Sequence, residues 1–457
     1  MILKRKIYNE LIRWKNEYSS KYALMIEGAR RIGKSTTVEL FAKEQYKSYV
    51  IIDFAKANER IKKNFYDNLN DLDTFFQIIS LEYNVRLFKH ETLIVFDEVQ
   101  KFPKAREAIK YLVSDGRYSY IETGSLISIK ENVDDIIIPS EERKIKMKPL
   151  DFEEFCLAGN EEILLNYIKS CAEKEIPLDN YYHNKAMWLF NEYILVGGMP
   201  QSVVAFFENN KDFYKSDDAK REILSLYKDD INKAAKRYGS KVSALFENLP
   251  GYLSTHEKRI VLNKIEDGAT FNKYDEPLFW LGDSMICNLC YKCNDPNIGF
   301  SLTKEDSAVK CYMGDTGLLI SHAFSENEIV SKNLYQSIMN GNVSLNKGMI
   351  YENVVAQMLV SLGKKLYFYS HYSSTLHRND MEIDFLISND SKTNVKVYPI
   401  EVKSTKNYST TSYDSFKNKF GKRISKSFII HPKQFMKDEA GYRLPPYMAM
   451  YFLNKAF

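Results

Sequence analysis

An eight-residue segment near the amino terminus carries the residue types that bind phosphate. It reads Gly-Ala-Arg-Arg-Ile-Gly-Lys-Ser from Gly28 to Ser35 and fits the pattern Gly-x-x-x-x-Gly-Lys-Ser/Thr. The glycines let the backbone curl so that its N–H groups point at phosphate oxygens, and a helix that begins at the loop adds its positive dipole end. Lys34 would neutralise the β- and γ-phosphates, and Ser35 would bind Mg²⁺. The alternative is an ordinary glycine-rich turn.

The local context of this segment favours phosphate binding. A short apolar run at 22–26 predicts a strand before the loop, and residues 34–44 predict a helix after it, as the motif requires. We therefore expect ATP with Mg²⁺ here. The residues expected to contact the nucleotide are Gly28, Ala29, Arg30, Arg31, Ile32, Gly33, Lys34, Ser35 and Thr36.

An acidic pair follows a second apolar run. Residues 92–96 predict a buried strand, which puts Asp97 at its carboxyl end, where ligands bind in open α/β sheets. Asp97 would hold Mg²⁺ directly or through water, and Glu98 would polarise the water that attacks the phosphate. The alternative is a solvated pair of carboxylates after a strand.

A third group of reactive side chains lies near the carboxyl terminus. Residues 381–387 and 397–403 alternate in the manner of strands, with Asp384 on the first and Glu401 and Lys403 on the second. Glu401 and Lys403 are two residues apart and share a face, so pairing of the strands would bring all three together. Two carboxylates bind Mg²⁺, which activates water, and a lysine stabilises the developing anion.

The elements that would position these residues fall into three regions. Strands alternate with helices up to about residue 150, which predicts a parallel sheet. The pattern is helical from about 152 to 256 and mixed again after about 345. The strands expected in the first region are Tyr22–Ile26, Tyr49–Phe54, Thr92–Phe96 and Tyr118–Thr123.

The order of these motifs resembles prokaryotic AAA-type P-loop ATPases that carry an uncharacterised C-terminal region. The resemblance covers nearly the whole chain. It is carried by Gly28–Ser35, Asp97–Gln100, Glu122–Ser125, Arg143 followed by Pro149–Phe155, Gly197–Pro200, Asp315–Leu319, and Gly348 with Glu352-Asn353.

The resemblance implies roles for two further residues. It makes Ser125 a polar sensor near the γ-phosphate, and it makes Arg143 a nucleotide-sensing arginine that acts in cis or across a subunit contact. The family usually has a small residue and a glycine before this arginine, whereas this chain has Glu141-Glu142. The alternative for Arg143 is a surface salt bridge.

The carboxylate–lysine set resembles the core of restriction-endonuclease-like nucleases, which have an aspartate and then Glu-x-Lys on the next strand. Those enzymes often add a glutamate from a preceding helix, and Glu352 on the predicted helix 348–362 matches it. The resemblance thus implies that Glu352, Asp384 and Glu401 bind metal and that Lys403 assists catalysis. The alternative is that the domain keeps this fold but only binds a partner and does not cleave.

We therefore expect an α/β protein in four parts. They are an AAA-type P-loop ATPase domain with an N-terminal helix (1–150), a helical lid or connector (151–215), a winged-helix-like region (216–310) and a restriction-endonuclease-like α/β domain (311–457). The winged helix rests on the resemblance alone. Acidic residues around Asp275 and Glu276 argue against tight phosphate contact in that region.

Composition limits the other possibilities. The chain has 457 residues, 44% hydrophobic and 27% charged, which is typical of a globular protein. The formal net charge is only +4, but 392–437 holds eleven Lys or Arg against Glu401 and Asp414. This basic stretch is either a solvated face or a contact for DNA or RNA. No apolar run is long enough to span a membrane.

The cysteines leave one question open. Cys287, Cys290, Cys293 and Cys311 have a spacing that would suit Zn²⁺ or an iron–sulfur cluster, although buried cysteines also act as small hydrophobes. Six cysteines in a chain of this size do not make a disulfide framework, so we expect the reducing cytoplasm.

Two hypotheses follow for the whole chain. In the first, ATP hydrolysis drives a C-terminal domain that cuts or contacts nucleic acid. In the second, the protein is a nucleotide-dependent switch whose C-terminal domain only binds a protein or DNA partner. The sequence does not determine the oligomeric state.

Overall fold

The computed structural model divides the chain into two compact units. The described residues are 1–124, 140–234, 238–255, 257–260, 262, 270–297, 299–324, 335, 339, 346–375, 377–389, 396–439 and 441–456. The N-terminal unit comprises residues 2–148 with 283–285, and the C-terminal unit comprises Met1, 149–282 and 286–457.

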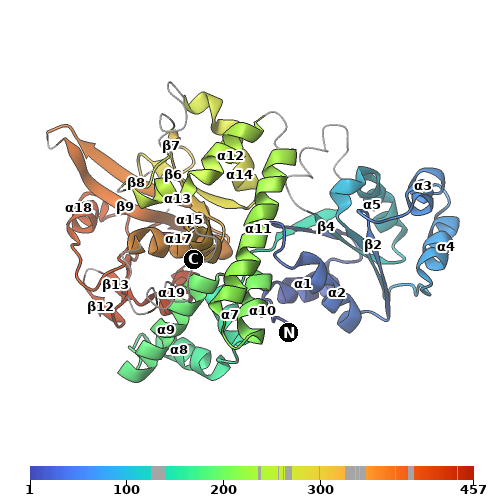
Figure 1. The fold of residues 1–457 in the computed structure, drawn as a ribbon, viewed down its shortest axis with the longest axis horizontal. Helices are drawn as coiled ribbons and strands as arrows, with labels where there is room; N and C mark the ends of the chain where they lie inside the picture. Colours follow the sequence, from blue (N-terminus) through green and yellow to red (C-terminus); the bar gives the residue numbers. More distant parts are fainter. Residues whose placement is uncertain are drawn as a thin grey trace. The chain divides into compact units, whose positions relative to one another are not determined.

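The N-terminal unit is built on a five-stranded sheet in the order β2-β3-β4-β1-β5. Strands β2 and β4 of this sheet are labelled in Figure 1. Every pairing in this sheet is parallel, so helices provide most of the crossover connections. Its elements are α1 (Ile7–Glu17), β1 (Ala23–Glu27), α2 (Lys34–Gln45), β2 (Ser48–Asp53), α3 (Glu59–Asp67), α4 (Leu72–Tyr83), β3 (Thr92–Asp97), η1 (Val99–Lys101), α5 (Pro103–Asp115), β4 (Ser119–Gly124) and β5 (Glu142–Lys146).

Apolar packing fixes the carboxyl ends of the central strands. Every residue of β1 and β3 is buried, as expected for central strands of a parallel sheet. Phe96, the residue before Asp97, packs against Phe54 and Phe65 with ring centroids 5.6 Å apart. This aromatic cluster holds the end of β3 in place.

The first part of the C-terminal unit is helical. Its helices are α7 (Phe152–Ala158), α8 (Glu162–Lys174), α9 (Asn180–Val196), α10 (Pro200–Glu208), α11 (Phe213–Ala234), α12 (Gly239–Glu247), α13 (Leu249–Ser254), η3 (Phe271–Lys273) and α14 (Asp275–Asp283).

Among the described helices of the chain, none combines the length and apolar character of a membrane-spanning segment.

The rest of this unit is a mixed eight-stranded sheet in the order β12-β13-β11-β10-β9-β8-β6-β7. Helix α17 contacts β6, β7, β8 and β10, and α18 contacts β9. The elements are β6 (Cys287–Cys293), β7 (Lys304–Met313), α15 (Thr316–Ala323), α17 (Lys347–Ser361), β8 (Leu366–Ser373), β9 (Arg378–Asn389), β10 (Lys396–Val402), α18 (Thr411–Phe420), β11 (Phe428–Ile430), β12 (Met436–Asp438), β13 (Gly441–Leu444) and α19 (Pro446–Ala456).

The expected fold class is confirmed: an α/β protein with a parallel N-terminal sheet, a helical middle and a C-terminal mixed sheet. The structure differs from the expected divisions inside the C-terminal unit. A division at 310 falls within β7, because β6 pairs with β7 and β8 and so belongs to the C-terminal sheet. A division at 215 falls within α11. Within the expected winged-helix-like region, residues 235–237, 256, 261, 263–269 and 298 lie outside the described residues.

Two glycines of the resemblance motifs form a tight junction between helices. Gly197 has a φ of 80°, and the Gly198 N–H donates to Asp315 Oδ2 over 2.5 Å. A Cβ on Gly198 would lie 2.1 Å from the carbonyl oxygen of Leu150. Asp315 also caps α15 by accepting from the Leu318 N–H over 3.0 Å. These motif residues therefore join α9, α10 and α15 and have a structural role.

The junction extends to the helix that carries Glu352. The Asn353 side chain accepts a hydrogen bond from the Met313 N–H over 2.8 Å and donates to the Met313 carbonyl over 3.2 Å. Gln357 Oε1, one turn along α17, accepts from the N–H of Thr316 over 2.9 Å. The end of β7 and the start of α15 thus fix the position of α17.

Candidate functional site

The segment 28–35 forms a loop between β1 and α2. A Cβ on Gly28 would lie 2.7 Å from the Met147 carbonyl oxygen, so the close approach of the backbone requires glycine there. Gly33 has a φ of 89° and Arg31 a φ of 68°, which curl the loop. Helix α2 begins at Lys34 and has no acidic residue in its first turn, so its positive dipole end faces the loop unneutralised.

Lys34 is buried inside this loop. Its ammonium donates to the carbonyl oxygens of Gly28 (3.0 Å) and Ala29 (2.9 Å). Burial lowers the pKa of Lys34 to about 8, an effect that the carboxylates of Glu98 and Asp97 partly oppose. The loop therefore encloses a cationic group that titrates near neutral pH.

Asp97 lies beside the loop at the carboxyl end of β3. Its Oδ1 accepts hydrogen bonds from the hydroxyls of Ser35 (2.9 Å) and Thr123. Phe96 pairs with Glu122, so the register of β3 and β4 sets Thr123 level with Asp97. Thr123 could not be recognised from the sequence, because a threonine in a strand carries no signal of its own.

The residues present fit ATP and Mg²⁺. The loop has a glycine cradle that a Cβ would fill, a buried ammonium for phosphate, and a hydroxyl next to a carboxylate for a hard cation. Glu98 follows Asp97 with a φ of 54°, and its carboxylate accepts from the Gln100 amide. Ser125 lies outside the described residues.

The arginine at 143 lies away from the loop. Arg143 is on β5 opposite Leu24, four residues before Gly28 and therefore about 13 Å along the strand. Its guanidinium lies over the ring of Tyr18, 3.6 Å from the centroid. The expected role in sensing the nucleotide of the same chain does not match this position, because a cation–π contact holds the side chain elsewhere.

A different arginine supports the loop. Arg5 donates to the carbonyl oxygens of Ile32 (3.0 Å) and Lys148 (2.6 Å), and so ties the loop to the end of the unit. Its sequence position in a charged helical start gave no indication of this contact.

The carboxylate–lysine set lines a cavity in the C-terminal unit. This cavity, here called the carboxylate cavity, has a volume of about 550 Å³ and is lined by Glu352, Asp384, Glu401 and Lys403, among others. Strands β9 and β10 pair antiparallel with Phe385 opposite Ile400, which brings Asp384 beside Glu401. The structure thus brings together all four residues that the sequence selected.

The two strand carboxylates are buried side by side. Asp384 Oδ2 accepts from the Val402 N–H over 2.7 Å, and Glu401 Oε1 accepts from the Lys403 ammonium over 2.6 Å. Burial and then Asp384 raise the pKa of Glu401 to about 8, and burial and then Glu352 raise the pKa of Asp384. Burial alone would lower the pKa of Lys403, but Glu401 outweighs it and raises that pKa.

Glu352 is surrounded by three residues that the sequence did not single out. The Lys258 ammonium pairs with Glu352 Oε1, and the Tyr312 hydroxyl donates to Oε2 over 3.1 Å. Fully buried Lys310 donates to Glu382 over 3.1 Å, and the carboxylates of Glu352 and Glu382 raise its pKa against the effect of burial. No local pattern identifies these residues, because they come from the middle region and from β7.

The Asp384–Glu401 pair fits a divalent cation. Glu401 Oε2 is buried with no hydrogen-bond partner among the described residues, and two adjacent buried carboxylates favour a cation between them. Mg²⁺ commonly takes only one or two carboxylates and fills its other positions with water and phosphate oxygens. Glu352 does not act as a third ligand, because Lys258 and Tyr312 occupy its oxygens. The described residues contain no group of three or more metal-ligating side chains.

The four cysteines at 287–311 do not form a metal site in the described residues. Cys287 and Cys290 are three residues apart on β6, so they lie on opposite faces of the sheet. All four are buried free thiols, and burial raises the pKa of Cys290. They therefore act as small hydrophobes in the core.

Three family models match parts of the chain. Residues 20–156 match an AAA domain, so this part is an AAA-type P-loop ATPase domain. Residues 187–328 and 347–444 match two families described as domains of unknown function, DUF8612 and DUF4143. No curated protein matches the chain.

Solved structures show only a distant likeness. PCH-2 of C. elegans is 13% identical with a TM-score of 0.23, over 49% of this chain and 70% of that one. AMPPCP-bound DnaA of Aquifex aeolicus is 12% identical (TM-score 0.25, 74% and 93% covered). Drosophila ORC bound to DNA is 11% identical (TM-score 0.27, 74% and 95% covered). With TM-scores below 0.5, none of them bears on the sites of this chain.

Proposed function

We propose that the N-terminal unit binds and hydrolyses ATP with Mg²⁺. The supporting observation is the loop 28–35, in which buried Lys34 and the Ser35–Asp97 hydrogen bond meet at the carboxyl ends of β1 and β3. Ligands bind at this edge of open α/β sheets. The AAA domain match over 20–156 supports the same assignment.

Each side chain of the loop would have a separate task. Lys34 would turn its ammonium from the carbonyls of Gly28 and Ala29 to the phosphate oxygens. Ser35 and Asp97 would hold Mg²⁺, which neutralises charge on the phosphates when bound. Glu98 would accept a proton from the water that attacks the γ-phosphate, and the bond to the β-phosphate oxygen would break.

Two substitutions test this proposal. Lys34→Ala should abolish binding of a fluorescent ATP analogue, whereas Glu98→Gln should bind it and lose at least about 10²-fold in turnover. Glu59→Gln, an exposed carboxylate on α3, is the matched control and should turn over at the wild-type rate. If Glu98→Gln hydrolysed ATP as fast as the control, the role of Glu98 would be refuted.

For the carboxylate cavity we propose metal-dependent hydrolysis of a phosphodiester. Asp384 and Glu401 would hold the divalent ion, and Lys403, 2.6 Å from Glu401, would stabilise the charge that develops on the phosphate. Water would add to phosphorus, and the leaving oxygen would take up a proton as its bond breaks. The unpartnered Glu401 Oε2 supports cation binding here.

A cleavage assay tests this second activity. Asp384→Asn should remove Mg²⁺- or Mn²⁺-dependent cleavage of labelled DNA and RNA, because it removes one charge from the pair. Asp414→Asn, at an exposed position of α18, is the control and should cleave as the wild type does. Cleavage that persists unchanged in Asp384→Asn would refute the proposal.

A specific contact favours a second candidate, a switch with a binding module. The ammonium of Lys258 pairs with the carboxylate of Glu352, as a metal ion would. Part of the negative charge of the carboxylate cavity is therefore balanced without a metal. A pure binding module predicts no cleavage of DNA or RNA in either metal. Retention of oligonucleotide binding by Asp384→Asn together with an inactive wild type would select this candidate.

A further inference from the structure

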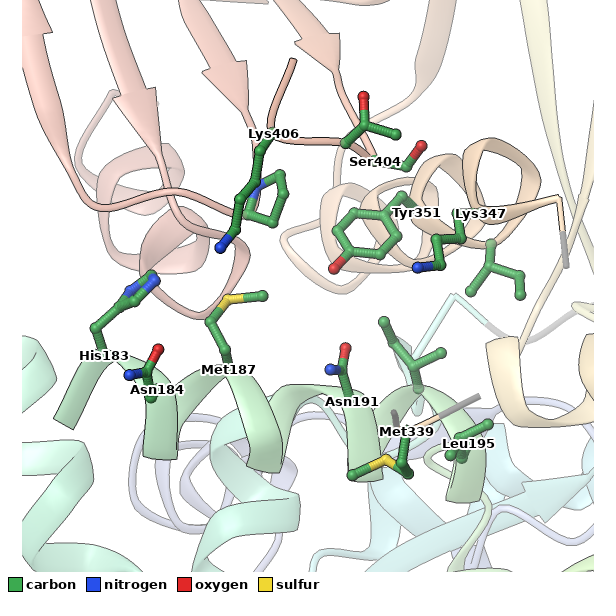
Figure 2. A pocket seen from close by; sticks show the side chains of 14 residues that line it. His183, Asn184, Met187, Asn191, Leu195, Met339, Lys347, Tyr351, Ser404 and Lys406 are labelled. Carbon is green, nitrogen blue, oxygen red and sulfur yellow. The ribbon is translucent and has the colours of Figure 1, made fainter. Parts of the chain in front are cut away.

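A second cavity lies in the C-terminal unit between α9 and α17. It has a volume of about 420 Å³ and is closed on a third side by the segment after β10. Figure 2 shows Met187 and Asn191 projecting from α9 toward Tyr351 and Lys347 of α17. Lys406 lies on the same side as Tyr351 and points toward α9 (Figure 2). We call it the α9–α17 cavity.

The charge of this cavity is opposite to that of the carboxylate cavity. The fourteen described residues that line the α9–α17 cavity include Lys347 and Lys406 but no Asp or Glu. Burial lowers the pKa of His183, which also lines the cavity, so its imidazole adds no charge at neutral pH. Both lysines are exposed. The lining of the carboxylate cavity, in contrast, contains five acidic residues. The α9–α17 cavity therefore attracts an anionic ligand.

The two cavities adjoin. Ser404 and Thr405, which directly follow Lys403, line both of them. A polymer with a phosphate at the Asp384–Glu401 pair would pass over these two hydroxyl-bearing residues and meet the two lysines next. Hydroxyls and lysines are common contacts of the phosphate backbone.

We infer that the α9–α17 cavity binds a single-stranded nucleic acid. The bound part of the strand lies next to the phosphate that would be cleaved in the carboxylate cavity. Lys347 and Lys406 contact successive phosphates, and the apolar surface of Met187 and Tyr351 lies against a base. The identity of this ligand rests on the proposed function of the carboxylate cavity. The charge and shape of the α9–α17 cavity do not depend on cleavage.

The size of the cavity selects an unpaired strand. Cavities of about 300–1,000 Å³ hold small molecules. A volume of about 420 Å³ therefore suits one nucleotide of a single strand better than a base-paired segment. Asn184 and Asn191 on α9 offer amide groups that can hydrogen-bond to base edges.

Fluorescence anisotropy with the full chain tests this inference. The probes are a fluorescein-labelled 12-nucleotide DNA, the same sequence as RNA, and a 12-base-pair duplex, all in EDTA so that no cleavage occurs. The double variant Lys347→Ala/Lys406→Ala should bind the single strands at least about fivefold more weakly than the wild type. Its salt slope should fall by about 1.4, since each lost phosphate contact on a single strand is worth about 0.7.

The control variant removes the same charge elsewhere. Lys169→Ala/Lys174→Ala lies on exposed positions of α8 that line neither cavity, and it should keep the wild-type affinity and slope. Equal behaviour of the two double variants would overturn the inference. Tighter binding of the duplex than of either strand would also overturn it, as would competition by poly-glutamate as effective as that by the oligonucleotide.

DNA and RNA both carry a phosphate backbone, and the two labelled single strands show which of them the cavity binds more tightly. Preference for one labelled strand identifies the natural polymer. The test also separates this inference from the cleavage proposal, because Asp384→Asn should lose cleavage while binding in EDTA stays lysine-dependent. If the wild type cleaved the strand but binding did not depend on Lys347 and Lys406, the inference about the α9–α17 cavity would be refuted and the cleavage proposal would stand.

Discussion

Burial shifts the reactive side chains of the two sites in opposite directions. It lowers the pKa of the Lys34 ammonium to about 8 and raises the pKa of the Glu401 carboxyl to about 8. Both shifts have loss of water as their first cause, since a buried group resists being charged. The neighbours then act in opposite ways: carboxylates help to keep Lys34 charged, while Asp384 further disfavours the charge on Glu401.

Nucleotide affinity is expected to fall as the pH rises above about 8, because a neutral Lys34 cannot pair with phosphate. The decrease should approach tenfold per pH unit, as for the loss of one required proton. Titration of a fluorescent ATP analogue from pH 7 to 9.5 measures it. Lys34→Arg, which stays charged, should bind with an affinity that does not change over this range. A constant wild-type affinity would contradict the role of Lys34.

Lys258 is expected to weaken divalent-cation binding to the carboxylate cavity, because its ammonium pairs with Glu352. Lys258→Met should bind Mn²⁺ more tightly in calorimetry and gain more thermal stability from added Mn²⁺ than the wild type. Lys365→Met, an exposed lysine after α17, is the control and should match the wild type. If Lys258→Met and the control bound Mn²⁺ equally, Lys258 would not compete for this site.

At the scale of elements, close backbone contacts decide where the side chains of the carboxylate cavity lie. The turn between α9 and α10, the start of α15 and helix α17 meet where Gly198 donates to Asp315 and Asn353 bonds both backbone groups of Met313. This junction fixes α17, and α17 carries Glu352 to the carboxylate cavity. A change at the junction should therefore affect stability first.

Gly198→Ala is expected to reduce the free energy of unfolding by about 3 kcal/mol or more, since its Cβ would lie 2.1 Å from the Leu150 carbonyl oxygen. Gly251→Ala on α13 is the matched control. A Cβ there meets nothing within 4 Å, so a stabilisation of about 0.5–1 kcal/mol is expected. Urea unfolding followed by circular dichroism measures both. Equal stability of the two variants would refute the tight junction.

At the scale of the whole molecule, the two sites belong to different compact units. The loop 28–35 lies in the N-terminal unit, and the residues of both C-terminal cavities lie in the C-terminal unit. ATP bound at the loop would act on the cavities by changing the populations of conformations of the chain. Such coupling of two binding sites is reciprocal.

Coupling is expected to change affinity by the same factor in both directions. With Glu98→Gln to prevent turnover, a saturating single strand should change the affinity for an ATP analogue at least about fivefold, and ATP should change strand affinity equally. Anisotropy and nucleotide fluorescence measure the two factors. The Lys347→Ala/Lys406→Ala variant should lose both effects at the same strand concentration. Independent binding at the two sites would refute the coupled cycle.

The sequence by itself determined the sites whose residues are close along the chain. The loop from Gly28 to Ser35 is contiguous. Alternation along two strands put Glu401 and Lys403 on one face and predicted that Asp384 would join them if the strands paired, which they do. Local backbone geometry sets these arrangements, so local spacing reveals them. The fold class followed from the same periodicities.

Only the tertiary structure decided which distant residues complete each site. Lys258 reaches Glu352 across 94 residues, and Thr123 reaches Asp97 across 26. Strands β6 and β7 pair within the C-terminal sheet, whereas the family resemblance had assigned β6 and the start of β7 to the winged-helix-like region. Such contacts depend on the packing of whole elements, which periodicity along the chain does not encode.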